Sequence, residues 1–123
     1  MEGFQGQVDK WMVKCFSREI AQNIPERNHR FLEEALELVQ STGATAQEAH
    51  MLVDYVFNRP VGDSAQELGG VVVTLAALST ALGFYMESAG IIELDRVNRP
   101  EIIERVRAKQ LTKPSSSPLP GDA

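Results

Sequence analysis

The stretch from Leu68 to Met86 constrains the fold most, because it contains no charged residue. Its length approaches what an α-helix needs to cross a bilayer. Small and hydroxyl-bearing residues dilute its hydrophobicity, namely Gly69, Gly70, Thr74, Ser79, Thr80 and Gly83. No basic cluster flanks either end to fix an orientation in a membrane. We therefore expect a central helix covered by its own bundle and by a second subunit, and no membrane partner.

The rest of the chain also predicts helices. Pro25 is a favoured first-turn residue, Thr45 to Glu48 has the pattern of a capping box, and Pro100 restarts a helix after Asn98. The expected helices cover residues 7–16, 25–40, 45–57, 63–82, 84–97 and 100–110, with a short turn over 17–22. No alternation typical of a strand occurs. The predicted fold class is all-α, a helical bundle.

Composition favours one domain. The chain has 123 residues, of which 43% are hydrophobic, and this suits a single compact domain that gains from self-association. We expect this domain to cover residues 1–111. The segment 112–123 is rich in Ser and Pro and is expected to be either a mobile tail or an extended segment that packs. Pro114, Pro118 and Pro120 leave two alternatives, a flexible end and a segment lying across a neighbouring subunit.

Charge and cysteine content exclude several classes of function. The net charge is −5, and no dense Lys/Arg stripe with interleaved aromatic residues occurs, so we expect no nucleic-acid partner. Cys15 is the single cysteine and has no internal disulfide partner. The N-terminus lacks the basic-then-apolar order of a secretory signal. We therefore expect a cytoplasmic protein.

An acidic cluster lies in the helix expected over 25–40. Glu34 and Glu37 are three residues apart and Glu33 and Glu37 four apart, so either pair can direct carboxylate oxygens at a common point. Clustered carboxylates on facing helices are typical of a site for a hard metal ion. The alternative is that all three glutamates solvate the outer face of the helix.

Glu67 lies at the head of the uncharged stretch, and the helix face that it shares is otherwise suited to packing. A carboxylate there is costly unless a cation, a basic partner or water compensates it. The alternative is a first-turn glutamate that the helix dipole stabilises. Gly70 follows one turn later, and glycine inside a helix costs about 1 kcal/mol relative to alanine. A neighbouring helix or a ligand that approaches closely would explain it.

The two acidic segments resemble the all-α nucleotide pyrophosphohydrolases of the MazG-like type, which carry an EExxE helix followed by an ExxD helix. The resemblance extends over residues 28–110. Glu33, Glu34 and Glu37 match the first motif in full, and Glu67 matches the glutamate of the second. The resemblance implies hydrolysis of a nucleoside triphosphate to the monophosphate and pyrophosphate. It also implies catalytic roles for the EExxE glutamates and Mg²⁺, with Mn²⁺ as an alternative, held by Glu34, Glu37 and Glu67.

The chain departs from this pattern at Gly70, where the family carries the aspartate of ExxD. Asp63 shares a face with Glu67 but is about 10 Å from Gly70 along the helix axis, so it does not replace the missing carboxylate. We therefore expect weaker metal binding or a changed number of metal ions, with reduced or specialised catalysis. Two other functions stay open: a catalytically weakened or inactive nucleotide-binding module, and a bundle whose acidic helix binds another protein.

Candidate substrate-binding residues are less specific. The resemblance implies phosphate contacts in the segment of Arg105 and Lys109, with Lys113 as a further candidate, and the alternative is a solvated basic face. Trp11 and His29 are candidates for contact with the base. Core packing is the alternative for Trp11, and a surface or capping role is the alternative for His29.

Two further expectations concern partners. Arg27 and Arg30 precede the acidic cluster and are expected to pair locally with Glu26, Glu33 or Glu34. The apolar central helix predicts a homodimer or a homotetramer built as a dimer of dimers, because its nearly all-round hydrophobicity exceeds what one small bundle needs.

Overall fold

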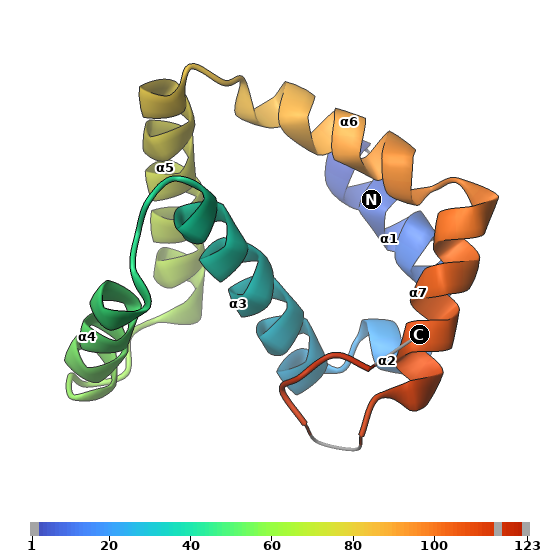
Figure 1. The fold of residues 1–123 in the computed structure, drawn as a ribbon, viewed down its shortest axis with the longest axis horizontal. Coiled ribbons are helices and arrows are strands. Elements are labelled where there is room, and N and C mark those ends of the chain that lie inside the picture. Colours follow the sequence, from blue (N-terminus) through green and yellow to red (C-terminus); the bar gives the residue numbers. More distant parts are fainter. Residues whose placement is uncertain (1–2, 115–116, 122–123) are drawn as a thin grey trace. The chain divides into compact units, whose positions relative to one another are not determined.

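The computed structural model describes residues 3–114 and 117–121, and over these ranges it contains seven helices and no strand (Figure 1). The predicted all-α class is confirmed. The helices are α1 (Gly3–Cys15), α2 (Arg18–Ala21), α3 (Ile24–Ser41), α4 (Ala46–Phe57), α5 (Ser64–Leu82), α6 (Met86–Val97) and α7 (Pro100–Thr112). The helix predicted over 7–16 begins earlier, and the predicted turn over 17–22 contains the single helical turn α2.

The predicted capping signals are confirmed. The Thr45 side chain accepts a hydrogen bond from the Glu48 backbone N–H at 3.1 Å, and the Glu48 carboxylate accepts one from the Thr45 N–H at 2.8 Å. These hydrogen bonds lower the pKa of Glu48, because they favour its charged form. Asp63 caps α5 by accepting from the Gln66 N–H at 3.0 Å. Gly83 ends α5 in the left-handed region with φ +78, where glycine is favoured.

The chain forms two compact units. The terminal unit combines the two ends of the chain, up to Ala35 and from Ile91 on, and the central unit is Leu36–Gly90. The terminal unit holds α1, α2, α7, the first part of α3 and most of α6. The central unit holds α4, α5 and the remaining residues of α3 and α6. The tail predicted over 112–123 belongs to the terminal unit, but residues 115–116 and 122–123 lie outside the described residues.

In the terminal unit, α1 packs against α2 and α7. Trp11 donates its indole N–H to the Val97 carbonyl oxygen at 3.0 Å and lies edge-to-face with Phe16, with ring centroids 6.4 Å apart. Arg107 donates from Nε to the Lys14 carbonyl oxygen at 2.8 Å. These contacts hold α7 and the end of α6 against α1, and Trp11 takes part in this packing.

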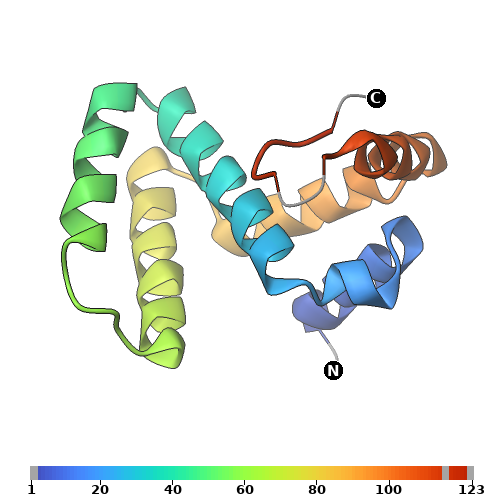
Figure 2. The same ribbon diagram turned by 90° about the horizontal axis from the view of Figure 1, so that it is seen from below.

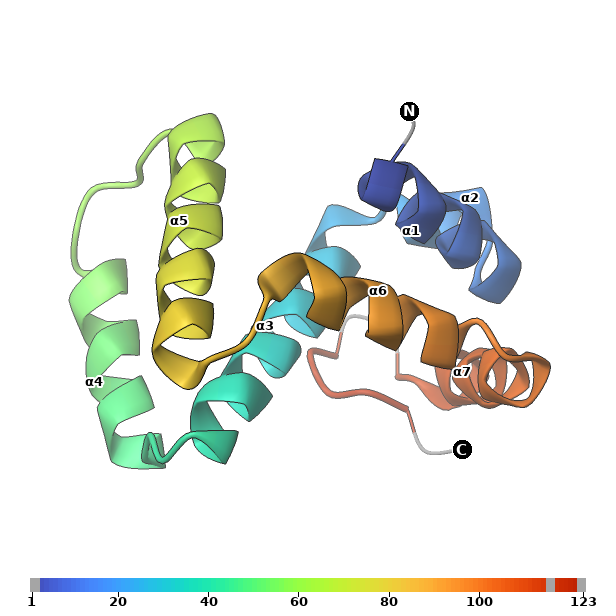
Figure 3. The same ribbon diagram turned by 90° about the horizontal axis from the view of Figure 1, so that it is seen from above.

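In the central unit, α4 and α5 lie alongside each other with opposite chain directions (Figures 2 and 3). The structure describes every residue of α5, and none of them is buried. Val73 is 68% exposed and Phe57, on α4, is 84% exposed. Within the central unit, the other described helices therefore do not bury α5 as expected, because none of them packs closely against it.

Candidate functional site

The three glutamates of the acidic cluster lie on the single continuous helix α3. Glu34 and Glu37 are exposed, and Glu33 is partly buried. The Arg30 Nε atom lies 3.4 Å from Glu33 Oε1. The predicted local ion pairs of Arg27 and Arg30 with Glu26 and Glu33 are confirmed.

Arg96 brings a cation to the acidic cluster that sequence reasoning missed. It makes an ion pair with Glu93 on α6, with Nε–Oε1 and Nη2–Oε2 distances of 2.9 and 2.7 Å. The hydrogen bonds with Glu93 are the main cause of the raised pKa of Arg96, and the charge of Glu34 contributes further. The spacing of Glu93 and Arg96 in the sequence predicts their pairing. It does not predict that the charge of Glu34 also acts on Arg96.

Glu67 lies in the first turn of α5 and is exposed. Its carboxylate folds back toward the loop that precedes the helix: a Cβ atom added to Gly62 would lie 2.6 Å from Glu67 Oε2. The N-terminal end of a helix favours negative charge, so the dipole stabilises Glu67 in this position. Gly62 leaves room for the carboxylate.

Gly70 has open space around it. No atom of the described residues lies within 4 Å of a Cβ added at Gly70, and the same holds for Gly69. No neighbouring helix of the same chain therefore explains the glycine at position 70. Asp63 does not stand in for the missing aspartate, because its carboxylate caps α5.

The predicted metal ligands belong to different units of the chain. Glu34 lies in the terminal unit and Glu67 in the central unit, and α3 carries Glu37 across the division. Among the described residues, no group of three His, Cys, Asp or Glu side chains is gathered as a metal site. The donor set nevertheless suits the predicted ion, since all three ligands are exposed carboxylates and Mg²⁺ prefers hard oxygen ligands.

The predicted substrate-binding residues differ in their surroundings. Arg105 and Lys109 are exposed on α7. Lys113, the further candidate, is instead buried in an ion pair, with Nζ 2.7 Å from Glu26 Oε2 and side-chain exposures of 7% and 8%. His29 is partly buried, and its Nδ1 atom is shielded from water without a hydrogen-bond partner.

The ion pair of Glu26 and Lys113 is the centre of a charge network that sequence reasoning found only in part. Arg27 and Arg30 approach the other oxygen, Glu26 Oε1, at 3.8 and 3.6 Å. Arg27 also lies over the Phe16 ring, 5.2 Å from its centroid. Burial lowers the pKa of Arg27, and the charge of Glu26 opposes this shift. The pairing of Lys113 with Glu26 joins distant segments, which no local pattern predicts.

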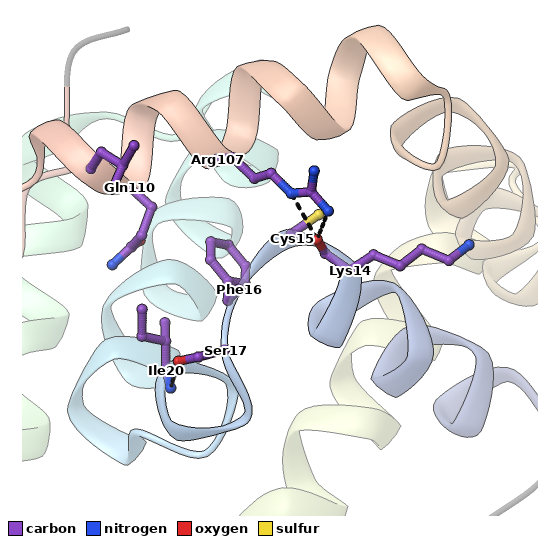
Figure 4. Close-up of a pocket in the computed structure, with 8 residues that line it drawn as sticks. Lys14, Cys15, Phe16, Ser17, Ile20, Arg107 and Gln110 are labelled. Atoms are coloured by element: carbon purple, nitrogen blue, oxygen red, sulfur yellow. Dashed lines mark hydrogen bonds between the residues drawn. The ribbon is translucent and has the colours of Figure 1, made fainter.

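A groove of 340 Å³ lies in the terminal unit, between the end of α1 and α7 (Figure 4). Its lining residues are Lys14, Cys15, Phe16, Ser17, Ile20, Arg107, Gln110 and Leu111. Burial raises the pKa of the Cys15 thiol, and the charges of Arg107 and Lys14 oppose the shift. The thiol is therefore protonated near neutral pH and is a poor nucleophile.

Comparisons of the chain with models of protein families, with curated proteins and with solved structures found no match.

Proposed function

We propose that this protein is a metal-dependent nucleotide pyrophosphohydrolase of the MazG-like type. It hydrolyses a nucleoside triphosphate to the monophosphate and pyrophosphate. The observation that carries the proposal is a complete EExxE motif on one helix, α3, with Glu34 and Glu37 exposed to solvent. An exposed Glu67 in the first turn of α5 supports it.

Glu34, Glu37 and Glu67 would hold Mg²⁺ or Mn²⁺. When bound, the ion would neutralise the triphosphate and lower the pKa of the attacking water. Glu33 orients this water and accepts its proton on Oε2, the oxygen opposite the one that faces Arg30. The water oxygen forms a bond to phosphorus, the bridge between the α and β phosphates breaks, and pyrophosphate leaves. The exposed cations Arg105 and Lys109 would bind the phosphates, and Trp11 and His29 would contact the base.

The proposed enzyme is a cytoplasmic homo-oligomer, either a dimer or a dimer of dimers, without a nucleic-acid or membrane partner. The support is the uncovered apolar surface of α4 and α5. A second copy that covers this surface would remove it from water, and each Å² of apolar surface so removed contributes about 25 cal/mol.

A second function is favoured by Gly70. Without the fourth carboxylate, the chain would bind a nucleotide through the same helices but hydrolyse it slowly or not at all. This nucleotide-binding module is the alternative that the experiment below separates from the enzyme.

The test is release of pyrophosphate from a panel of ribo- and deoxyribonucleoside triphosphates, with Mg²⁺ or Mn²⁺. We expect metal-dependent release that Glu37→Gln abolishes and that the control Glu101→Gln, an exposed glutamate at the start of α7, leaves unchanged. The melting temperature with metal and nucleotide is measured in parallel. A nucleotide-dependent rise without release would support the binding module, and no response in either assay would contradict both functions.

A further inference from the structure

The described end of the chain is packed against the body of the terminal unit. We call residues 117–121 the C-terminal strap; Figures 1 and 2 show this segment between the start of α3 and α7. Gly121 is buried against the end of α7. A Cβ atom added there would lie 2.5 Å from Thr112 Oγ1 and 2.6 Å from Lys113 N, and would also clash with the Lys109 carbonyl oxygen. These contacts leave room only for glycine while the strap is docked.

Arg30 joins the strap to the acidic cluster. Its Nη2 atom donates a hydrogen bond to the Pro118 carbonyl oxygen in the strap. Its Nε atom faces Glu33 Oε1 at 3.4 Å, and its Nη1 atom lies 3.6 Å from Glu26 Oε1. The Arg30 side chain is only 24% exposed. One guanidinium thus contacts the strap and two acids of α3.

The neighbouring charges direct Arg30 toward Glu33. Lys113 Nζ lies 2.7 Å from Glu26 Oε2 and already compensates the charge of Glu26, so the attraction between Glu26 and Arg30 is weakened. The planar guanidinium presents its donors in a fixed fork, so fixing one nitrogen fixes the direction of the others. When Pro118 holds Nη2, Nε stays within ion-pair distance of Glu33, although the two atoms make no hydrogen bond. An undocked strap would release the guanidinium to other rotamers.

We infer that Arg30 is a positioning residue through which the docked C-terminal strap fixes the carboxylate of Glu33. The claim that this affects catalysis rests on the proposed function, in which Glu33 orients the attacking water. The claim that the strap and Glu33 are linked through Arg30 does not depend on any activity.

The structural link is tested by NMR on the full chain. Gly121→Ala introduces the Cβ that clashes with α7, and Leu119→Ala, at a strap position that is 70% exposed, is the matched control. In Gly121→Ala we expect a lower heteronuclear NOE for the amides of residues 117–121 and a shifted carboxylate ¹³C resonance of Glu33. In Leu119→Ala we expect neither change. An undocked strap with an unshifted Glu33 resonance would overturn the inference, as would an unshifted Glu33 resonance in Arg30→Gln.

The catalytic consequence is tested by a double-mutant cycle on pyrophosphate release. Gly121→Ala and Arg30→Gln should each lower kcat about tenfold, the lower end of what loss of a residue supporting a site costs, with KM for the nucleotide unchanged. The double variant should lose no more than either single variant, because both changes act through the same contact. Additive losses, or an effect on KM alone, would overturn this role.

The two proposals fail in distinguishable ways. A native chain that releases no pyrophosphate contradicts the proposed function, while the NMR comparison of Gly121→Ala with Leu119→Ala still decides the link from the strap to Glu33. An active chain whose kcat is unchanged with the strap undocked contradicts the positioning role alone.

Discussion

Glu26 and Lys113 form an ion pair that is almost fully shielded from water, with side-chain exposures of 8% and 7%. Removing two charges from water costs several kcal/mol per ion, and only close and well-directed partners repay it. Lys113 at 2.7 Å meets this condition for Glu26 Oε2, whereas the arginines at 3.6 and 3.8 Å leave Oε1 without a hydrogen bond. The pair links the first turn of α3 to the end of α7, so its loss should loosen the terminal unit.

Replacing Lys113 with methionine should therefore be strongly destabilising. The variant keeps most of the side-chain volume but leaves Glu26 with more distant partners, and breaking a buried pair typically costs about 3 kcal/mol or more. The measurement is the free energy of unfolding in urea. Lys109→Met, at an exposed position of the same helix, is the control and should change this free energy by no more than about 0.5 kcal/mol. Equal losses in the two variants would contradict the structural role of the pair.

Cys15 predicts a loss of stability at alkaline pH. Burial raises the pKa of its thiol in the folded chain, while the unfolded thiol titrates near pH of about 8.5. Above that pH the folded state binds more protons than the unfolded state, so the free energy of unfolding falls as pH rises. Between pH 7 and 9.5, the native chain should lose more stability than Cys15→Ala in parallel urea titrations. Equal losses would show that the thiol does not contribute.

At the scale of single elements, local patterns predicted the helices well. Thr45 and Asp63 each accept a hydrogen bond from a free backbone N–H at a helix start, and Pro100 has no N–H to leave free. These effects are local, so the nearby sequence is enough to predict where each helix begins. The placement of Glu33, Glu34 and Glu37 on one helix was predicted for the same reason, since their spacing lies within one element. The pairing of Lys113 with Glu26 could not be predicted, because it depends on how α3 and α7 pack. The nearly all-round hydrophobicity of α5 indicated a cover from outside the chain, but not that every residue of the helix would lack burial.

Gly70 offers a direct test of the missing carboxylate. The open space around position 70 means that Gly70→Asp should fold, and replacing a helical glycine removes part of its cost of about 1 kcal/mol. The variant restores the ExxD spacing with Glu67, one helical turn away. We expect tighter Mg²⁺ binding, measured by calorimetry, and faster pyrophosphate release.

The control for this gain is Gly69→Asp. That position is equally open, but it lies about 160° around the helix from Glu67, whereas Gly70 lies about 60° from Glu67. Gly69→Asp should therefore fold without tightening Mg²⁺ binding. Equal effects of the two aspartates would indicate a general gain in negative charge rather than a restored ligand.

At the scale of the whole molecule, the described residues of one chain bury almost no apolar side chains. Among the residues that the structure describes, only Met12 and Cys15 are hydrophobic and buried. Meanwhile α5, which has the length and composition of a helix able to cross a membrane at a mean hydropathy of 1.4, has no buried residue. Conformational entropy opposes folding by about 1–2 kcal/mol per ordered residue, so burial must come from elsewhere. A second copy and a lipid phase are the two covers that such a helix can take.

A substitution at Val72 can distinguish a second copy from a lipid phase as the cover of α5. Val72 is 48% exposed on α5 and lies away from Glu67 around the helix. If a second copy covers α5, the native chain should have at least twice the 13.6 kDa monomer mass by light scattering without detergent. Val72→Lys should then lower that mass toward the monomer and also lower the melting temperature, because it places a charge in the apolar contact. Val61→Lys, at a position before α5 that is 99% exposed, should change neither. A native chain that requires detergent, and that sediments with neutral lipid vesicles, would instead assign α5 to a membrane.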